Sequence, residues 1–344
     1  IAAMGNAPLP TKKAKPTDLT KRELRLMYDV RRAEQAIRDQ LKQEPLSAER
    51  TVAGVVKAMQ NWFGQGDQPL LRQGIVASGS HPITALKLYL RSWKAGFSKA
   101  EMEKVNREVE NHEDRGLMEH VGLQFDGEMG KNQEFFLPSK VSGFPTVGFS
   151  DRAFVTGMNG LRVKVWDTLK NMLVGKNGRD LTIDEASLIA NAVNVATGKG
   201  HGKKAYRTTG EVQTFWSPGM QKARLKWLTL QPLWREMVKR GTDGKIRANL
   251  LPKARAMIAL ELYLKPAMTA VAVYTLMSAM GYDISLDPLD SDFGKAKIGD
   301  TRTDMTGGMG QYVVLAARMI TGKRKDPKTG RHVNADKGRL LWNF

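Results

Sequence analysis

The sequence predicts a mainly α-helical protein, a multi-helix bundle with one small β-hairpin near residues 295–303. Apolar residues recur at helical spacing along most of the chain. Several of these segments begin with Ser or Thr followed three residues later by Glu, which is the pattern of a capping box. A chain of 344 residues is long enough for two or three packed units with sizeable cores.

Three regions are expected along the chain. Residues 1–16 are rich in Pro and Lys and predict an extended basic arm, which either contacts phosphates or forms a solvated tail. Residues 17–130 form an N-terminal helical region, and residues 149–344 form a C-terminal helical region. The stretch 129–150 contains Pro and Gly at close intervals and is the best candidate for a boundary between them.

Helix starts in the N-terminal region are marked by capping residues. Thr20 and Glu23 have the capping-box spacing and predict a helix that begins there. A second amphipathic helix is expected over 52–63. Ser98 and Glu101 repeat the capping-box pattern and predict a further helix start.

The C-terminal region shows the same signals. Ser150 is the expected N-cap of a long amphipathic helix, and Thr182 with Glu185 predicts a capping box on the next one. Short alternating segments surround Gly299-Asp300, which is a two-residue turn signal, and predict the hairpin over 295–303.

Composition narrows the class of partner. The chain has 54 Lys and Arg against 35 Asp and Glu, a net charge of +19, and no cysteine. A protein this basic is expected to meet an acidic partner such as nucleic acid or an anionic membrane; an acidic protein is the alternative. The absence of cysteine excludes disulfides and thiolate chemistry. Residues 101–128 are locally acidic and are expected to face solvent or a basic partner.

Basic residues are concentrated between Gly198 and Arg255, interleaved with Trp216, Trp227 and Trp234. This pattern predicts a surface that contacts phosphates, bases or lipid headgroups, and the alternative is a set of amphipathic helices with tryptophan in the core. The candidate contact residues are Lys199, Lys203, Lys204, Arg207, Lys222, Arg224, Lys226, Arg235, Lys239 and Arg240.

Catalytic and metal-binding patterns are not found. His112 and His120 are eight residues apart near several carboxylates, but no third ligand is close in sequence, and they are interpreted as surface histidines. The glycine- and lysine-rich stretch 198–204 lacks the spacing of a phosphate-binding loop. We therefore expect no catalytic residues, no metal and no cofactor in this region.

The longest uncharged apolar run lies between Lys265 and Asp283, from Pro266 to Tyr282. Its seventeen residues are at the lower limit for a membrane-spanning helix. Its small residues also suit a central helix of a soluble bundle. The buried helix is the favoured interpretation, and membrane insertion in another state is the alternative.

A sequence motif follows this run. It contains Asp292, Phe293, Gly294, Lys295, Gly299, Thr301, Arg302 and Asp304. It is preceded by Asp287, Asp290 and Ser291, and followed by Gly307-Gly308, Gln311-Tyr312 and Thr321-Gly322-Lys323. This order resembles the conserved core of large polyvalent phage proteins, in which a hydrophobic helix leads into a similar hairpin motif. The family pattern usually has Trp or a similar residue before the glycine pair, where this chain has Thr306.

The resemblance implies an internal virion protein of a tailed bacteriophage, ejected with the genome and located afterwards in the host envelope or cytoplasm. Its implied partners are other virion proteins including copies of itself, phage DNA and the host membrane, and no catalytic residues are carried over. The alternative is a structural protein of the capsid interior or head–tail connector that stays in the particle. An enzyme whose catalytic groups come from distant residues is a third hypothesis, which no residue favours.

Overall fold

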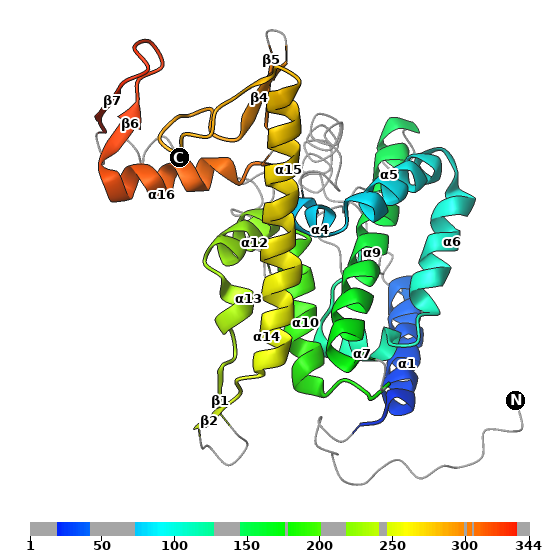
Figure 1. Cartoon of the computed structure of the whole chain (residues 1–344). Coiled ribbons are helices and arrows are strands. Elements are labelled where there is room, and N and C mark those ends of the chain that lie inside the picture. Colours follow the sequence, from blue (N-terminus) through cyan, green and yellow to red (C-terminus); the bar gives the residue numbers. More distant parts are fainter. Residues whose placement is uncertain are drawn as a thin grey trace, which may run out of the picture.

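The fold was analysed in a computed structural model of the whole chain, drawn in Figure 1. The helical class and the small hairpin are both confirmed. The structure describes residues 19–41, 73–126, 145–175, 178–200, 218–240, 246–298, 301–304 and 306–335. The predicted arm at 1–16 and the predicted helix at 52–63 lie outside these ranges.

The longest helix, α9 (Pro145–Val174), organises the bundle. Within the described chain it packs mainly on four helices, which are α5 (Pro82–Phe97), α6 (Lys99–Glu110), α10 (Ile183–Ala196) and α14 (Pro252–Ala259). Trp166 and Leu161 of α9 are completely buried and form the centre of the hydrophobic core. Burial of this apolar surface is the main stabilising contribution to the fold.

Other helices surround this group. α1 (Lys21–Leu41) packs on α7 (Arg115–Val121), and α4 (Ile75–Ser80) contacts α5 and the base of α15 (Lys265–Ala279). α12 (Pro218–Leu228) and α13 (Gln231–Trp234) pack on α10. Core residues come from both predicted helical regions, for example Leu117 and Ile189. The division of the chain at 129–150 stays a prediction.

The last part of the chain carries the strands. α14 continues through a π-helical turn, η3 (Leu260–Leu264), into α15 (Lys265–Ala279). β3 (Asp283–Ile284), β4 (Lys295–Ile298) and β5 (Thr301–Asp304) then form an antiparallel sheet in that order. The chain continues with α16 (Gly310–Thr321) and ends its described part with a second hairpin, formed by β6 (Lys323–Lys325) and β7 (His332–Asn334). A third hairpin lies earlier in the chain and consists of β1 (Val238–Arg240) and β2 (Ile246–Ala248). Only the β4–β5 hairpin was predicted.

The predicted helix caps are largely confirmed. Thr182 accepts a hydrogen bond from the Glu185 backbone at 3.2 Å, and the Glu185 carboxylate accepts one from the Thr182 backbone at 3.0 Å. Thr20 with Glu23 does the same, and Ser98 caps α6. The prediction for Ser150 is wrong, because α9 begins at Pro145 and Ser150 lies inside it. Proline suits the first helical position, where its fixed φ is already helical and an N–H is not needed.

The Thr182 cap makes a modest contribution that is measurable. T182A is expected to lower the free energy of unfolding by about 1 kcal/mol, because the Glu185 backbone N–H in the first turn of α10 loses the hydroxyl that accepts its hydrogen bond. The matched control is T168A, whose hydroxyl donates to the Lys164 carbonyl inside α9 and caps nothing. Urea denaturation of both variants checks this, and equal losses would contradict the capping role.

Buried ions connect three parts of the bundle. Asp126, after α7, is fully enclosed and pairs with Arg162 of α9 and with Lys199 after α10, the latter at 2.6 Å. Arg162 also donates to Thr197 at 3.1 Å, and Asn159 bonds both ways with the Asp126 backbone at 2.8 Å. Such a network stabilises the fold only while every charge keeps its partner.

This network corrects the interpretation of the acidic stretch 101–128. Asp126 faces inward, and so does Asp114, which is buried and bonded to Lys170 at 2.6 Å and to the Trp166 indole at 3.2 Å. Glu108, nearer the surface, is held by Arg91 at 2.8 Å. Basic residues of the same chain therefore neutralise much of this stretch, and its two aspartates do not face solvent.

Candidate functional site

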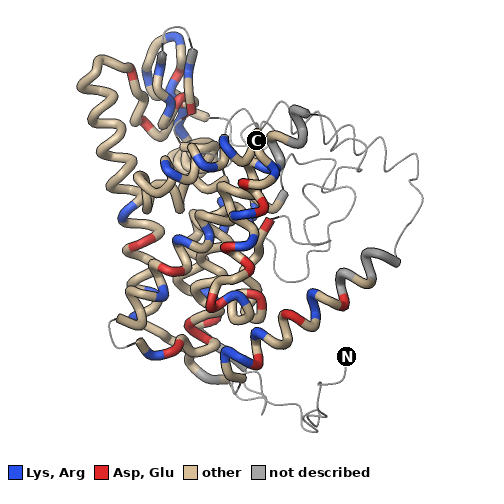
Figure 2. Tube along the Cα trace, turned by 90° about the vertical axis from the view of Figure 1, so that its right-hand side faces the viewer, with Lys and Arg blue, Asp and Glu red and all other residues tan. Residues whose placement is uncertain are grey.

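The most unusual feature of the fold is the exposure of α15. It stands at the front of the molecule in Figure 1, and Figure 2 shows it in tan. Its first residue, Lys265, is its only charged residue. None of its 15 residues, all of which the structure describes, is buried. Large apolar side chains are exposed along its length, including Met268 at 63%, Val271 at 64% and Leu276 at 62%.

This exposure makes the favoured interpretation of 266–282 as a buried helix wrong. A helix that is apolar all round is normally enclosed, either in a protein core or in a bilayer. Among the residues described, one helix is long and apolar enough to cross a membrane; it spans Pro252–Ala279, and 17% of its most apolar window is buried. A core helix of a soluble protein would be mostly buried.

The base of α15 is firmly attached to α4. A Cβ at Gly79 would lie 3.1 Å from the Pro266 side chain, so the glycine permits the two helices to approach closely. The Thr269 hydroxyl donates to the Gly79 carbonyl at 2.7 Å, and the Ser80 hydroxyl donates to the Glu261 carbonyl at 2.6 Å. The second bond reaches the π-helical turn, where the regular backbone pattern is interrupted and a carbonyl accepts from outside the helix.

A buried carboxylate strengthens this attachment. Glu261 lies in the π-helical turn with a side chain that has no exposed surface. It is 2.7 Å from His81 and 2.6 Å from Lys265. The base of α15 is thus fixed by packing, hydrogen bonds and charge, while no residue along its length is buried.

The motif residues form a cap at the other end of α15. The Tyr274 hydroxyl donates to the Gly294 carbonyl at 3.2 Å. Gly294 has a φ of +71°, and a Cβ there would collide with the Thr306 methyl group and lie 3.1 Å from the Tyr274 hydroxyl. The motif glycine is therefore required by its backbone conformation and by the closeness of two neighbours.

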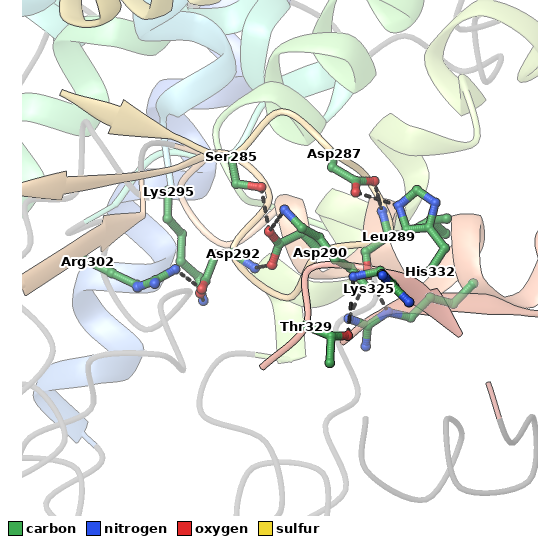
Figure 3. A network of polar contacts seen from close by, with 12 residues as sticks. Ser285, Asp287, Leu289, Asp290, Asp292, Lys295, Arg302, Lys325, Thr329 and His332 are labelled. Atoms are coloured by element: carbon green, nitrogen blue, oxygen red, sulfur yellow. Dashed lines mark hydrogen bonds and ion pairs between the residues drawn. The ribbon is translucent and has the colours of Figure 1, made fainter. Parts of the chain in front are cut away.

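Three aspartates hold the cap together, as Figure 3 shows. Asp292 pairs with Lys295 at 3.0 Å and with Arg302 of β5. Asp290 bonds to Ser285 at 2.8 Å and to Lys325 of β6 at 3.0 Å. These contacts join the β4–β5 hairpin to the β6–β7 hairpin, although the two hairpins belong to different sheets.

The third aspartate, Asp287, is 2.8 Å from His332 of β7. Its hydrogen bonds to His332 and to the Leu289 backbone lower the pKa of Asp287 below its usual value. Burial raises the pKa of Asp290, but Lys325 and Ser285 outweigh it, so that the net pKa is lowered as well. Asp287 and Asp290 are thus held in their charged form by basic neighbours, which is typical of a structural network.

The glycine turn after the hairpin connects the cap to the bundle. The Asp304 carboxylate accepts from the backbone of Thr306 at 2.8 Å and of Gly308 at 2.6 Å. Gly307 and Gly308 both have positive φ, and the Arg224 guanidinium of α12 donates to the Gly307 carbonyl. The turn needs glycine because Arg224 fills the space beside it.

The close contact at Gly294 predicts a measurable loss of stability. In G294A, a positive φ costs about 1 kcal/mol and the overpacking against Thr306 adds about 1–3 kcal/mol. G330A is a matched control, since Gly330 has a φ of +68° and open space around it. Thermal denaturation should therefore show a larger loss for G294A. Equal losses in the two variants would contradict the close contact between Gly294 and Thr306.

The structure changes which basic residues can form a contact surface. Lys199 and Arg224 are each 7% exposed and are bound to Asp126 and Gly307, so they do not lie on an open surface. Lys226 donates to the Gly200 carbonyl at 2.6 Å, and Arg235 donates to Asn191. Lys222 is exposed.

The other basic candidates are not placed by the structure. Lys203, Lys204 and Arg207 lie outside the described residues, as does Trp216. Lys239 and Arg240 are described only as backbone positions of β1. The set of ten candidates therefore does not form one described surface.

The two described tryptophans of this segment differ. Trp227 is partly buried, stacks on Tyr263 with centroids 5.1 Å apart, and donates to the Leu262 carbonyl at 3.0 Å. Trp234 is 54% exposed. The expected aromatic surface is thus only partly present, because Trp227 belongs to the packing around η3.

The histidine near the acidic stretch has a structural partner. His112 is 3.0 Å from Asp167 through Nε2, and its Nδ1 accepts from the Asp114 backbone at 3.1 Å. It is therefore not a free surface side chain. No group of three or more metal-ligating side chains occurs in the described part of the chain.

Comparisons with protein-family models, with curated proteins and with solved structures gave no match to this chain. The candidate site is therefore defined by its own geometry. It consists of the exposed helix α15, its attachment at Glu261 and Gly79, and the cap formed by the motif residues.

Proposed function

We propose that this chain is a non-enzymatic internal virion protein of a tailed phage, ejected with the genome, and that α15 contacts the host membrane. One observation carries the membrane part: α15 is apolar on all sides and has no buried residue. In water, apolar surface that stays exposed costs about 25 cal/mol of free energy per Å² relative to buried surface. A bilayer removes that cost without needing a shaped partner.

Length and charge agree with this role. The helical part of the uncharged run Pro266–Tyr282 ends at Ala279 and is about 21 Å long, enough to reach through most of the roughly 30 Å hydrocarbon core of a bilayer. Lys265 and Asp283 mark its two ends. The net charge of +19 favours approach to an anionic surface. The resemblance of the motif from Asp292 to Asp304 to the phage proteins supports the virion part of the proposal.

The decisive experiment for the virion part is the protein composition of full and emptied particles. We expect this chain in full particles and its loss when DNA is ejected. A chain that stays in the emptied particle would contradict ejection and would favour the alternative, a structural protein of the capsid interior or head–tail connector.

Contact with phage DNA is a separate part of the proposal and has its own test. Because Lys and Arg displace counterions from phosphates, the binding constant should fall linearly on a log–log plot against salt. Fluorescence anisotropy with duplex DNA at 50–200 mM salt, roughly the range over which such binding collapses, measures the slope. Binding that does not depend on salt, or no binding, would remove DNA from the partners.

A further inference from the structure

A second apolar surface lies on α5, on the side of the helix that faces away from its buried residues. It consists of Ile83, Leu86, Leu90, Trp93 and Phe97, whose exposed fractions are 72%, 60%, 62%, 44% and 78%. Their spacing of three, four, three and four residues places all five on one stripe of the helix. The opposite side is already used for packing, because Ala85, Ser92, Ala95 and Gly96 are buried. The stripe is therefore a continuous apolar face, and Phe149 of α9 makes ring contacts with its aromatic end.

The aromatic end of this stripe is rigid. The Trp93 and Phe97 rings both meet Phe149 of α9 edge to face, with centroids 5.4 Å and 4.8 Å apart. Gly96 permits this approach, since a Cβ there would collide with the Phe149 ring. Arg152 fixes the helix end by donating to the Gly96 carbonyl at 3.0 Å. Exposed Trp and Phe are thus held in place at the surface.

The charges of α5 indicate what this face contacts. The helix has no acidic residue. Arg91 is occupied by Glu101 and Glu108, whereas Lys87 is exposed and lies beside the stripe. Lys94, on the same flank, has a 73% exposed side chain and only a 4.0 Å approach to Glu101. Apolar and aromatic side chains bordered by lysine are typical of helices that lie in the interface of an anionic bilayer.

We infer that the outer face of α5 is an interfacial membrane-binding surface that recognises anionic lipid headgroups through Lys87 and Lys94. A second copy of the chain is the competing occupant, because the spacing also suits a helix pair. Pairing two identical faces would bring their lysines together and oppose association. The inference deepens the proposed membrane contact, but it rests on a different helix from α15.

Cosedimentation of the whole chain with lipid vesicles tests this surface. We expect tighter binding to vesicles that contain phosphatidylglycerol than to vesicles of phosphatidylcholine alone. K87E/K94E should weaken binding to the anionic vesicles at least about tenfold, since each lysine contributes roughly fivefold. L90D should also weaken it at least about tenfold, through the loss of apolar contact. The matched control, K104E, changes an exposed lysine of α6 and should bind as the unmodified chain does.

Three outcomes would overturn the inference. They are binding that K87E/K94E and L90D leave unchanged, equal loss in K104E, and a dimer in sedimentation that L90D dissociates. The same assay with V271D, a substitution on α15, separates the two surfaces. If V271D leaves binding unchanged while K87E/K94E removes it, the proposed role of α15 fails and that of α5 stands; the reverse pattern has the opposite meaning.

Discussion

D126N is expected to lower the free energy of unfolding by about 3–5 kcal/mol, the largest stability effect in this chain. Asparagine has nearly the same shape, but it leaves Arg162 and Lys199 buried without their shared counter-charge. Both cations are almost completely enclosed, so water cannot replace the lost partner. Urea denaturation followed by circular dichroism measures the loss.

A surface pair provides the matched control. Asp29 lies 3.4 Å from Arg25 on α1 with half of its side chain exposed, so D29N should cost less than about 1 kcal/mol. If D126N and D29N cost the same, the buried network does not hold the bundle together.

The same carboxylate predicts an acid dependence of stability. Burial raises the pKa of Asp126, but Arg162 and Lys199 outweigh it and the net pKa lies below the ordinary value. The stabilisation is therefore complete above the unfolded pKa of about 3.9 and is lost as the pH falls through the lower folded pKa. Unfolding curves recorded from pH 7 down to about pH 3 should show a steeper loss for the unmodified chain than for D126N. Parallel curves would contradict this assignment.

V271D is expected to reduce binding to lipid vesicles at least about tenfold with little effect on folding. An aspartate in the middle of a membrane-inserted helix costs about 2.5–3.5 kcal/mol. Val271 is 64% exposed, so the free energy of unfolding in water should change by less than about 0.5 kcal/mol. Vesicle flotation and denaturation of the same sample measure both quantities.

The control for V271D is I320D. Ile320 is 84% exposed on α16, so this variant adds the same charge to another exposed apolar position of the described chain. It should float with vesicles as the unmodified chain does. Equal losses in V271D and I320D would show that added negative charge, and not the position on α15, weakens binding.

Local signals in the sequence predicted the local structure well. Capping boxes at Thr20 and Thr182 and the turn signal at Gly299-Asp300 lie within a few residues of the groups that they pair. The predicted start of α9 was wrong because two N-terminal signals, Pro145 and Ser150, lie close together. The helix begins at the first of them.

Long-range partners could not be predicted in this way. The basic pattern suggested that Lys199 and Arg224 face outward, but their partners, Asp126 and Gly307, are far away in the sequence. Composition also could not tell a buried α15 from an exposed one, because apolar helices in a core and in a bilayer have the same side chains. The α5 stripe has a clear spacing in the sequence, yet only its contacts with α9 show which face is left open.

The most direct test of the account measures whether α15 enters lipid. Because the chain has no cysteine, L276C provides a single site for an environment-sensitive fluorophore, and K104C on α6 provides a matched control. With anionic vesicles, we expect the label at L276C to shift to the blue and to become shielded from aqueous iodide, while the label at K104C stays accessible. A label at L276C that remains as accessible to iodide as the one at K104C would contradict the membrane role of α15.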